Sequence, residues 1–210
     1  MDLSFLTYTI GVLTLKKKVG EGMNIIENQP ALLVLDVQKG FDDPYWGKRN
    51  NLEAENNILT LLTEWRKRNW TVIYSQHLSL EPQSPFHYKN PEGTEFKDST
   101  KPLSGEVIMQ KNVNSAFIGT QLETYLKTNQ IKTVVITGLS TQHCVSTTTR
   151  MSGNLGFTTF LGSDATAAYE VTDHNGTYYT PEDIHQTELA TLHKEFATIV
   201  KTSDILNQLK

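Results

Sequence analysis

Short apolar runs alternate with segments of helical periodicity along most of the chain. The run from Ala31 to Leu35 is continuously apolar, which predicts a strand buried on both faces of a sheet. Residues 52–68 instead place their apolar side chains on one stripe at helical spacing. The expected strands are 31–35, 71–76, 106–110, 132–137, 158–161 and 197–200. The expected helices are 52–68, 119–129, 142–155, 181–196 and a short final one capped by Ser203.

This alternation predicts a three-layer, Rossmann-like α/β domain with a mainly parallel six-stranded sheet and helices on both faces. One segment breaks the alternation, because residues 81–102 contain four prolines and show no periodicity. A loop of this length in a compact domain commonly carries function.

The length of the chain fits one domain, but its first residues do not fit the pattern. With 210 residues, of which 38% are apolar, the chain can bury one core. Residues 5–15 are apolar with no basic residue before them, which is unlike a signal peptide. Codons for Gly20-Glu21-Gly22 are purine-rich and resemble a ribosome-binding site before Met23. We therefore expect residues 1–22 to be a non-native or flexible extension, and 23–210 to form a single domain; an N-terminal mass of the native protein tests this.

Charge and cysteine usage narrow the classes of partner. The 19 Lys and Arg residues against 23 Asp and Glu give a net charge of -4 without a dense basic cluster, so we expect no nucleic acid partner. No apolar run reaches the length of about 18 residues that a membrane span needs, so we expect no membrane partner. A single cysteine excludes an internal disulfide and favours a cytoplasmic location.

Three reactive side chains stand where expected strands end. Asp36 closes the first strand, Lys111 closes the strand 106–110, and Cys144 follows the strand 132–137. The carboxyl ends of parallel strands meet at one edge of the sheet, so an acid, an ammonium and a thiol can converge there. A carboxylate can take a thiol proton, while a nearby ammonium and a helix N-terminus both favour the thiolate. Taken singly, Asp36 also fits a helix cap, Lys111 a solvated edge residue, and Cys144 a buried core thiol.

Three separated segments resemble the isochorismatase-like cysteine hydrolases, the superfamily that includes nicotinamidases and carbamoylsarcosine amidases. They are LLVLDVQKGF (32–41), EVIMQKNVNSAFIGTQLETYL (106–126) and VVITGLSTQHCVSTTTRMSGNLGF (134–157). The resemblance implies that Asp36, Lys111 and Cys144 form a catalytic triad. It also implies a cis peptide between Leu139 and Ser140, and an oxyanion hole formed by the backbone N–H groups of Ser140 and Cys144. Proteins of this superfamily are commonly homodimers or larger homo-oligomers, so the resemblance implies a homodimer or larger homo-oligomer for this chain.

The chain departs from the nicotinamidase pattern at the second strand. Nicotinamidases carry a metal-binding Asp-x-His there, whereas this chain has His77 and Ser79 at the two positions. His77 and His87 remain a possible pair, but a stable site normally needs three or four ligands. We therefore expect no metal and no cofactor, and a function other than nicotinamidase.

The resulting prediction is a cysteine-dependent hydrolase that cleaves a small-molecule linear amide or related C–N bond through a thioester. Expected substrate-binding residues are Gln38, Phe41, Trp46, His77 and Phe117, although Gln38 also fits a role in holding a loop. His143 is expected to point away from the triad.

Two other interpretations remain open from the sequence. The chain fits an isochorismatase-type hydrolase of another bond, or a non-catalytic Rossmann-like protein that binds a small molecule. Nucleotide binding is disfavoured, because the turn at Asp36-Val37-Gln38-Lys39-Gly40 lacks a glycine-rich phosphate loop.

Overall fold

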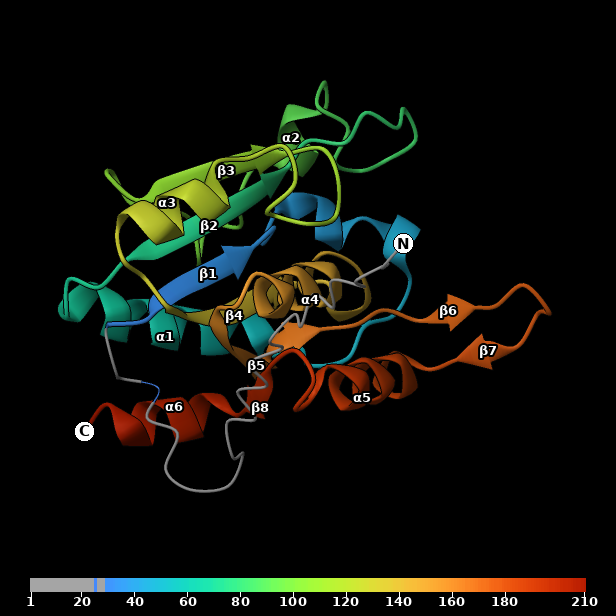
Figure 1. The fold of residues 1–210 in the computed structure, drawn as a ribbon. Coiled ribbons are helices and arrows are strands. Elements are labelled where there is room, and N and C mark those ends of the chain that lie inside the picture. Colours follow the sequence, from blue (N-terminus) through green and yellow to red (C-terminus); the bar gives the residue numbers. More distant parts are fainter. Residues whose placement is uncertain (1–24, 26–28) are drawn as a thin grey trace, which may run out of the picture.

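A parallel six-stranded sheet forms the centre of the molecule (Figure 1). The computed structural model describes residue 25 and residues 29–210, so the expectation for residues 1–22 lies outside the described residues. The strand order is β3-β2-β1-β4-β5-β8, with every neighbouring pair parallel. The strands are β1 (Ala31–Leu35), β2 (Val72–His77), β3 (Val107–Lys111), β4 (Thr133–Leu139), β5 (Thr158–Ala167) and β8 (Thr198–Val200). The expected parallel sheet with helices around it is therefore confirmed.

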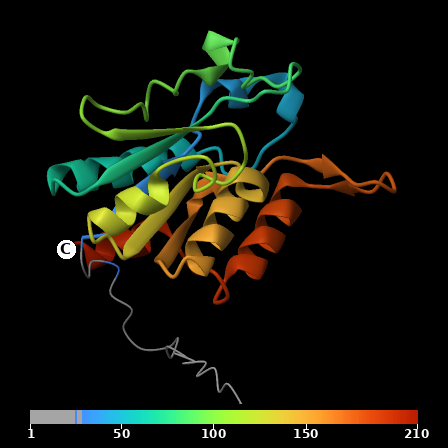
Figure 2. The same ribbon diagram turned by 45° about the horizontal axis from the view of Figure 1, so that its top comes forward.

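Helices cover both faces of this sheet. They are α1 (Ala54–Lys67), α3 (Leu122–Thr128), α4 (Ser146–Asn154), α5 (Pro181–Leu192) and α6 (Thr202–Gln208), while the short helix α2 (Pro91–Thr94) contacts the turn at residues 39–42. Figure 2 shows α3, α4 and α5, in yellow to orange-red, across one face. Helices α1 and α6 contact each other on the opposite face. Since both faces are covered, the strands can be apolar on both sides, as β1 is throughout.

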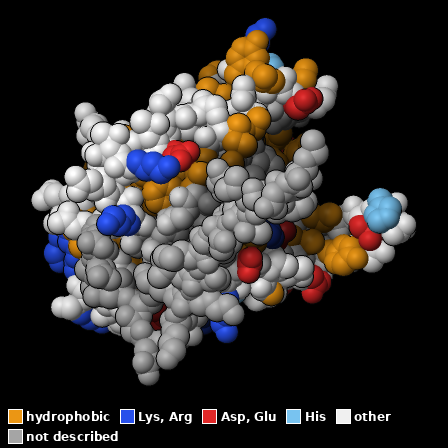
Figure 3. Space-filling model, viewed as in Figure 1, with side chains coloured by type: hydrophobic (Ala, Val, Ile, Leu, Met, Phe, Trp, Pro, Cys, Tyr) orange, Lys and Arg blue, Asp and Glu red, His pale blue; other side chains and the backbone are white. Residues whose placement is uncertain are grey.

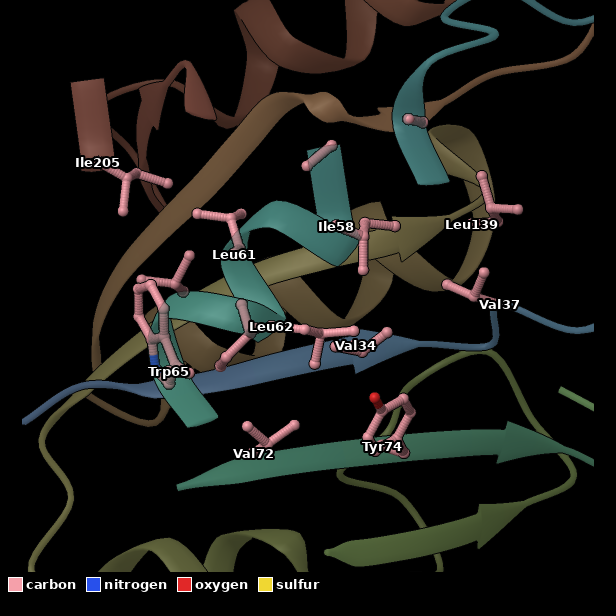
Figure 4. Packing of buried hydrophobic residues seen from close by; sticks show 14 of the residues in the cluster. Val34, Val37, Ile58, Leu61, Leu62, Trp65, Val72, Tyr74, Leu139 and Ile205 are labelled. Atoms are coloured by element: carbon pink, nitrogen blue, oxygen red, sulfur yellow. The ribbon is translucent and has the colours of Figure 1, made fainter. Parts of the chain in front are cut away.

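The apolar stripe of α1 explains why this helix forms and where it packs. Its buried residues are Ile58, Leu61, Leu62 and Trp65, and the helix contacts β5, β1, β4 and β2 (Figure 4). The Trp65 indole is fully buried, and its Nε1–H donates to the Pro30 carbonyl at 2.7 Å, which satisfies the one polar atom of the side chain. Truncating a buried leucine in such a layer typically costs about 2–5 kcal/mol of stability.

The two central strands approach closely because of one glycine. Gly138 in β4 pairs with Leu35 in β1 and has a φ of 120°. A Cβ at Gly138 would lie 2.1 Å from the Leu35 carbonyl oxygen, so no other residue fits without a shift of the backbone. This contact fixes the end of β4 beside the end of β1, where Asp36 follows.

The structure differs from the expected elements in several places. The long loop contains the short helix α2, whose first residue is Pro91 and whose N-cap Asn90 accepts from the Gly93 N–H. The expected helix 142–155 is divided into a π-helical turn (Thr141–Val145) and α4. Ser203 is not a cap, because Lys201 holds the N-cap position and α6 already begins at Thr202.

A projecting hairpin was not predicted. It consists of β6 (Val171–Thr172) and β7 (Tyr178–Tyr179), which pair antiparallel. Each strand has two residues, too few to show an alternating pattern in the sequence. Figure 3 shows the hairpin as an arm that carries apolar and acidic side chains away from the body.

Candidate active site

The carboxyl edge of the sheet brings the three predicted side chains together. Asp36 directly follows β1, Lys111 is the last residue of β3, and Cys144 lies in the π-helical turn after β4. Strand β2 lies between β1 and β3 and contributes Ser75 and His77. The site is therefore built on rigid strand ends.

The Lys111 ammonium lies at the centre of this group. Its Nζ is 2.5 Å from Asp36 Oδ2, 3.3 Å from Cys144 Sγ and 3.1 Å from His77 Nδ1. A fourth acceptor, the Val113 carbonyl, lies at 3.1 Å. The acid, the ammonium and the thiol are each at most 5% exposed, so water screens their interaction little.

The Asp36 carboxylate is oriented by contacts on both oxygens. Ser75 Oγ donates to Oδ1 at 2.6 Å, while Lys111 donates to Oδ2. The Asp36 backbone has a φ of 50°, a left-handed conformation that a non-glycine residue adopts at a cost of about 1 kcal/mol or more. Strain of this kind is retained where the surrounding structure requires it, and here Ser75 and Lys111 hold the carboxylate that follows this backbone.

Two influences act against the charged form of the Cys144 sulfur. Burial raises the pKa of Cys144, and the Asp36 carboxylate raises it further, while Lys111 offsets these effects only in part. Burial and Asp36 thus oppose the thiolate that Lys111, and the expected helix N-terminus, favour. Burial alone would lower the pKa of Lys111, but the Asp36 carboxylate raises it above its ordinary value. The ion pair of the site is Asp36 with Lys111, and the Cys144 sulfur lies 3.3 Å from the same ammonium.

A cavity of about 500 Å³ opens onto the thiol. Its lining residues come from the strand ends, the long loop and the turn after β3. They are Asp36, Phe41, Tyr45, Trp46, His77, Ser79, Glu81, Gln83, Ser84, Phe86, Asn112, Val113, Asn114, His143 and Cys144. Phe41, Trp46 and Phe86 form one wall, with ring centroids 4.7–5.6 Å apart. A small ligand with an apolar surface fits such a cavity.

The backbone before Cys144 has two notable features. The peptide bond between Leu139 and Ser140 is cis. The Ser140 carbonyl accepts from the N–H groups of His143 and Val145, at 3.1 and 3.3 Å. The Ser140 N–H itself has no acceptor among the described residues.

Comparison with known proteins agrees with this arrangement. The family model of the isochorismatase domain matches residues 30–204. The chain belongs to the isochorismatase family. It is 59% identical to the isochorismatase family protein YrdC of Bacillus subtilis, over 87% of this chain and 97% of that protein. It is also 27% identical to maleamate amidohydrolase of Pseudomonas putida, over 87% of each chain. A solved hydrolase of the family from Chromobacterium violaceum has a TM-score of 0.82 and 39% identity, and the match covers 86% and 93% of the two chains.

His77 stands where nicotinamidases have a metal-binding Asp, so its surroundings show whether this isochorismatase-family site fits a metal ion. Ligand atoms of Asp36, His77 and Cys144 lie within 4.8 Å of one another, a spacing that three metal ligands can have. Lys111 Nζ, however, lies within hydrogen-bond distance of all three side chains. A metal ion would have to displace this cation, so the donor set fits an ion pair better than a metal centre.

Three of the five expected substrate-binding residues line the cavity of this family member, namely Phe41, Trp46 and His77. Gln38 is fully buried and does not line it. Its Oε1 accepts from the His77 N–H at 2.7 Å, and its Nε2 donates to the His77 carbonyl at 3.0 Å. Gln38 therefore holds the end of β2. Phe117 stacks on Phe157 at 5.9 Å in the core on the α3 side, away from the cavity lining.

His143 was expected to point away from the triad, and its contacts among the described residues are with Ser140 and Trp46 and not with Asp36, Lys111 or the Cys144 sulfur. It lines the cavity, its ring lies 6.0 Å from Trp46, and its Nδ1 is 3.0 Å from Ser140 Oγ. Glu81 and Asn114 also line the cavity. Glu81 begins the long loop that the sequence marked as a whole, but the sequence singled out neither residue.

Proposed function

We propose that this protein is a cysteine hydrolase that cleaves a small-molecule linear amide, or a related C–N bond, through a thioester. The single observation that carries the proposal is the Lys111 ammonium, which contacts both the Asp36 carboxylate and the Cys144 sulfur at the base of the cavity. A family that includes a maleamate amidohydrolase supports amide chemistry.

In the proposed mechanism Asp36 acts as the general base. It takes the Cys144 proton as the thiolate attacks the carbonyl carbon, and Lys111 stabilises the negative sulfur as charge develops. The backbone N–H groups of Ser140 and Cys144 are the proposed donors to the oxyanion. Asp36 then returns the proton to the leaving ammonia or amine. Water, deprotonated by the same carboxylate, hydrolyses the thioester and restores the thiol.

The raised pKa of the Cys144 thiol fits this sequence of steps. A thiolate beside Asp36 is disfavoured by burial, so proton removal is coupled to attack on the substrate. A non-catalytic binding protein has no need for a carboxylate and an ammonium beside a buried thiol. Cleavage of another type of bond is the second candidate, and a screen of linear amides, carbamoyl compounds and cyclic amides by ammonia release separates the two.

Labelling of the single cysteine with iodoacetamide tests the general-base role without a known substrate. Asp36→Asn removes a negative charge, and electrostatics alone would lower the Cys144 pKa and speed labelling. If Asp36 accepts the proton, labelling at neutral pH slows instead, by about tenfold or more. Glu195→Gln is the matched control, because it removes a charge between α5 and β8 at the opposite edge of the sheet. Faster labelling of Asp36→Asn would contradict the proposal.

Turnover provides the second test. Cys144→Ala should lower kcat by at least about 10⁴-fold on any true substrate, with an unchanged fold by circular dichroism. Mass spectrometry of quenched wild-type enzyme should show an acyl adduct on Cys144. Substantial residual activity of Cys144→Ala would exclude covalent catalysis by this thiol.

Assembly and location remain proposals. We propose a homodimer or larger homo-oligomer in the cytoplasm, supported by the projecting hairpin, on which Tyr178 and Tyr179 are 52% and 39% exposed. Among the described residues, none of the helices has the length and apolar character needed to cross a membrane. Light scattering of the full chain measures the assembly, and a monomer mass at micromolar concentration would contradict it.

A further inference from the structure

The charges around the cavity are unequal. Two carboxylates, Asp36 and Glu81, belong to the lining, whereas no Arg or Lys does so among the described residues. Lys111 lies beneath the lining and neutralises Asp36 through the 2.5 Å ion pair. Glu81 therefore remains as the uncompensated charge of the cavity wall.

Glu81 is held at the cavity by the backbone of the long loop. Its N–H donates to Ser79 Oγ at 3.1 Å, and Ser79 is bonded to Phe86 and Tyr88 across the loop. The Glu81 side chain is exposed and forms no ion pair within the described part of the chain. Its charge is thus available to a ligand in the cavity.

The two histidines of the lining add no positive charge near neutral pH. Burial lowers the pKa of His77, and the neighbouring Lys111 lowers it further. Burial likewise lowers the pKa of His143. In addition, Lys111 can only donate, so a hydrogen bond from its ammonium to His77 Nδ1, 3.1 Å away, requires that this nitrogen carries no proton.

Aromatic faces complement the acid. Tyr45 and Trp46 line the cavity together with Phe41 and Phe86, and the Trp46 Nε1–H is bound to the Gly40 carbonyl at 2.9 Å. Because this N–H is already hydrogen-bonded, Trp46 can contact a ligand through the face of its ring. Aromatic faces beside a carboxylate attract a cationic group through the ring quadrupole and the negative charge together.

We propose that the substrate is an amide whose remainder carries a positive charge, that uncharged amides are used less well, and that amides bearing a carboxylate are rejected. This inference rests on the proposed function in one respect, namely that the substrate is an amide. The charge preference follows from the residues that line the cavity. The acid at the rim and the aromatic wall hold the cationic group, while the carbonyl lies at Cys144.

The single thiol allows a direct measurement of this preference. Two methanethiosulfonates of equal length, one ending in trimethylammonium and the other in sulfonate, are reacted with the full chain and followed by whole-protein mass spectrometry. Each rate is divided by the rate of the same reagent with 2-mercaptoethanol. We expect the cationic reagent to react at least about tenfold faster than the anionic one after this correction. A ratio near or below one would overturn the inference.

Variants at Glu81 identify the source of the preference. Glu81→Gln should lower the cation-to-anion ratio about fivefold, which is the upper range for one exposed charge. Glu81→Lys should reverse the order of the two reagents. Glu195→Gln, which removes a charge at the far edge of the sheet, should leave the ratio unchanged. A ratio that is the same in Glu81→Gln and wild type would overturn the assignment to Glu81.

Amide hydrolysis separates this inference from the proposed function. The probes are 3-aminopropanamide, butanamide and succinamate, which are similar in length and are cationic, neutral and anionic. We expect kcat/KM to fall in that order, and Glu81→Gln to narrow the differences. Equal hydrolysis of all three would overturn the charge preference alone. Charge-selective labelling without hydrolysis of any amide would contradict the proposed function and uphold the charge preference.

Discussion

Two groups of charges in this molecule use similar side chains in different ways. Around Glu55, Arg49 donates to both carboxylate oxygens at 2.7 and 2.8 Å, and Lys97 adds a contact of 2.9 Å. Around Lys111, one ammonium is shared among a carboxylate, a thiol, an imidazole and a carbonyl. The first group gives one acid two cations and holds no nucleophile. The second places its cation beside a thiol that faces a cavity.

The charges around Glu55 stabilise the fold, whereas those around Lys111 prepare a reaction. Glu55 is stabilised as a carboxylate, because its two cations outweigh the effect of burial and lower its pKa to about 2. At Cys144 burial and Asp36 work against the charged form of the sulfur. A structural network therefore stabilises the charged form of its acid, whereas the site near Lys111 opposes the charged form of its nucleophile until a substrate arrives.

Among substitutions in the two groups of charges, the largest effect on activity and stability is expected at Lys111. Lys111→Met should lower kcat by about 10³-fold or more, because the developing thiolate loses its cation. It should also cost about 3–5 kcal/mol of unfolding free energy, because Asp36 is left buried without a partner. Kinetics and urea unfolding measure the two effects.

A double variant separates catalysis from stability at the same position. Asp36→Asn combined with Lys111→Met removes both charges, so much of the lost stability should return while activity stays absent. Recovery of activity in the double variant would show that the ion pair has a structural role only.

A smaller effect is expected at Glu55. The difference between its ordinary pKa of 4.5 and the folded value of about 2 corresponds to about 3 kcal/mol. Because the folded value is the lower one, this stability is present above pH 4.5 and is lost as the pH falls toward 2. Glu55→Gln should therefore flatten the acid limb of a stability-against-pH curve. Its kcat should be close to that of wild type, and a large loss of kcat would contradict the structural assignment.

The smallest effects are expected at two aromatic residues, Trp46 and Phe117, which were both predicted from the sequence to bind substrate. Trp46→Leu should raise KM several-fold with little change in Tm, because Trp46 lines the cavity and is only partly buried. Phe117→Leu should lower stability by about 1 kcal/mol and leave KM unchanged, because Phe117 packs in the core. The opposite pattern would reverse the two assignments.

Much of the fold could be predicted because buried parallel strands leave a strong signal. The run from Ala31 to Leu35 is apolar at every position, and it forms β1 within the same bounds. The hairpin of β6 and β7 left no such signal, since its two-residue strands lie outside the core. The division of the helix around Cys144 was also invisible, because a π-helical turn differs from an α-helix in hydrogen bonding and not in composition.

Some residues of the site were likewise predictable from the sequence, and others were not. Asp36, Lys111 and Cys144 were predictable because strand ends and a family resemblance both mark them. The roles of Gln38 and Phe117 were not, because a polar residue after a strand and an aromatic residue in a loop fit either a pocket or a core. Glu81 depends on how the long loop folds back through Ser79 and Phe86, which no local pattern encodes.

The strand order has a consequence for how the protein is made. Strand β1 pairs with β2, which follows soon after it, and with β4, where Ala31 meets Val134 about a hundred residues later. During translation one edge of the most apolar strand therefore stays open until β4 leaves the ribosome. An open apolar edge of this kind attracts other chains. Nascent chains that stop before residue 133 should need a chaperone to remain in solution, whereas chains that extend past Leu139 can close the sheet around β1.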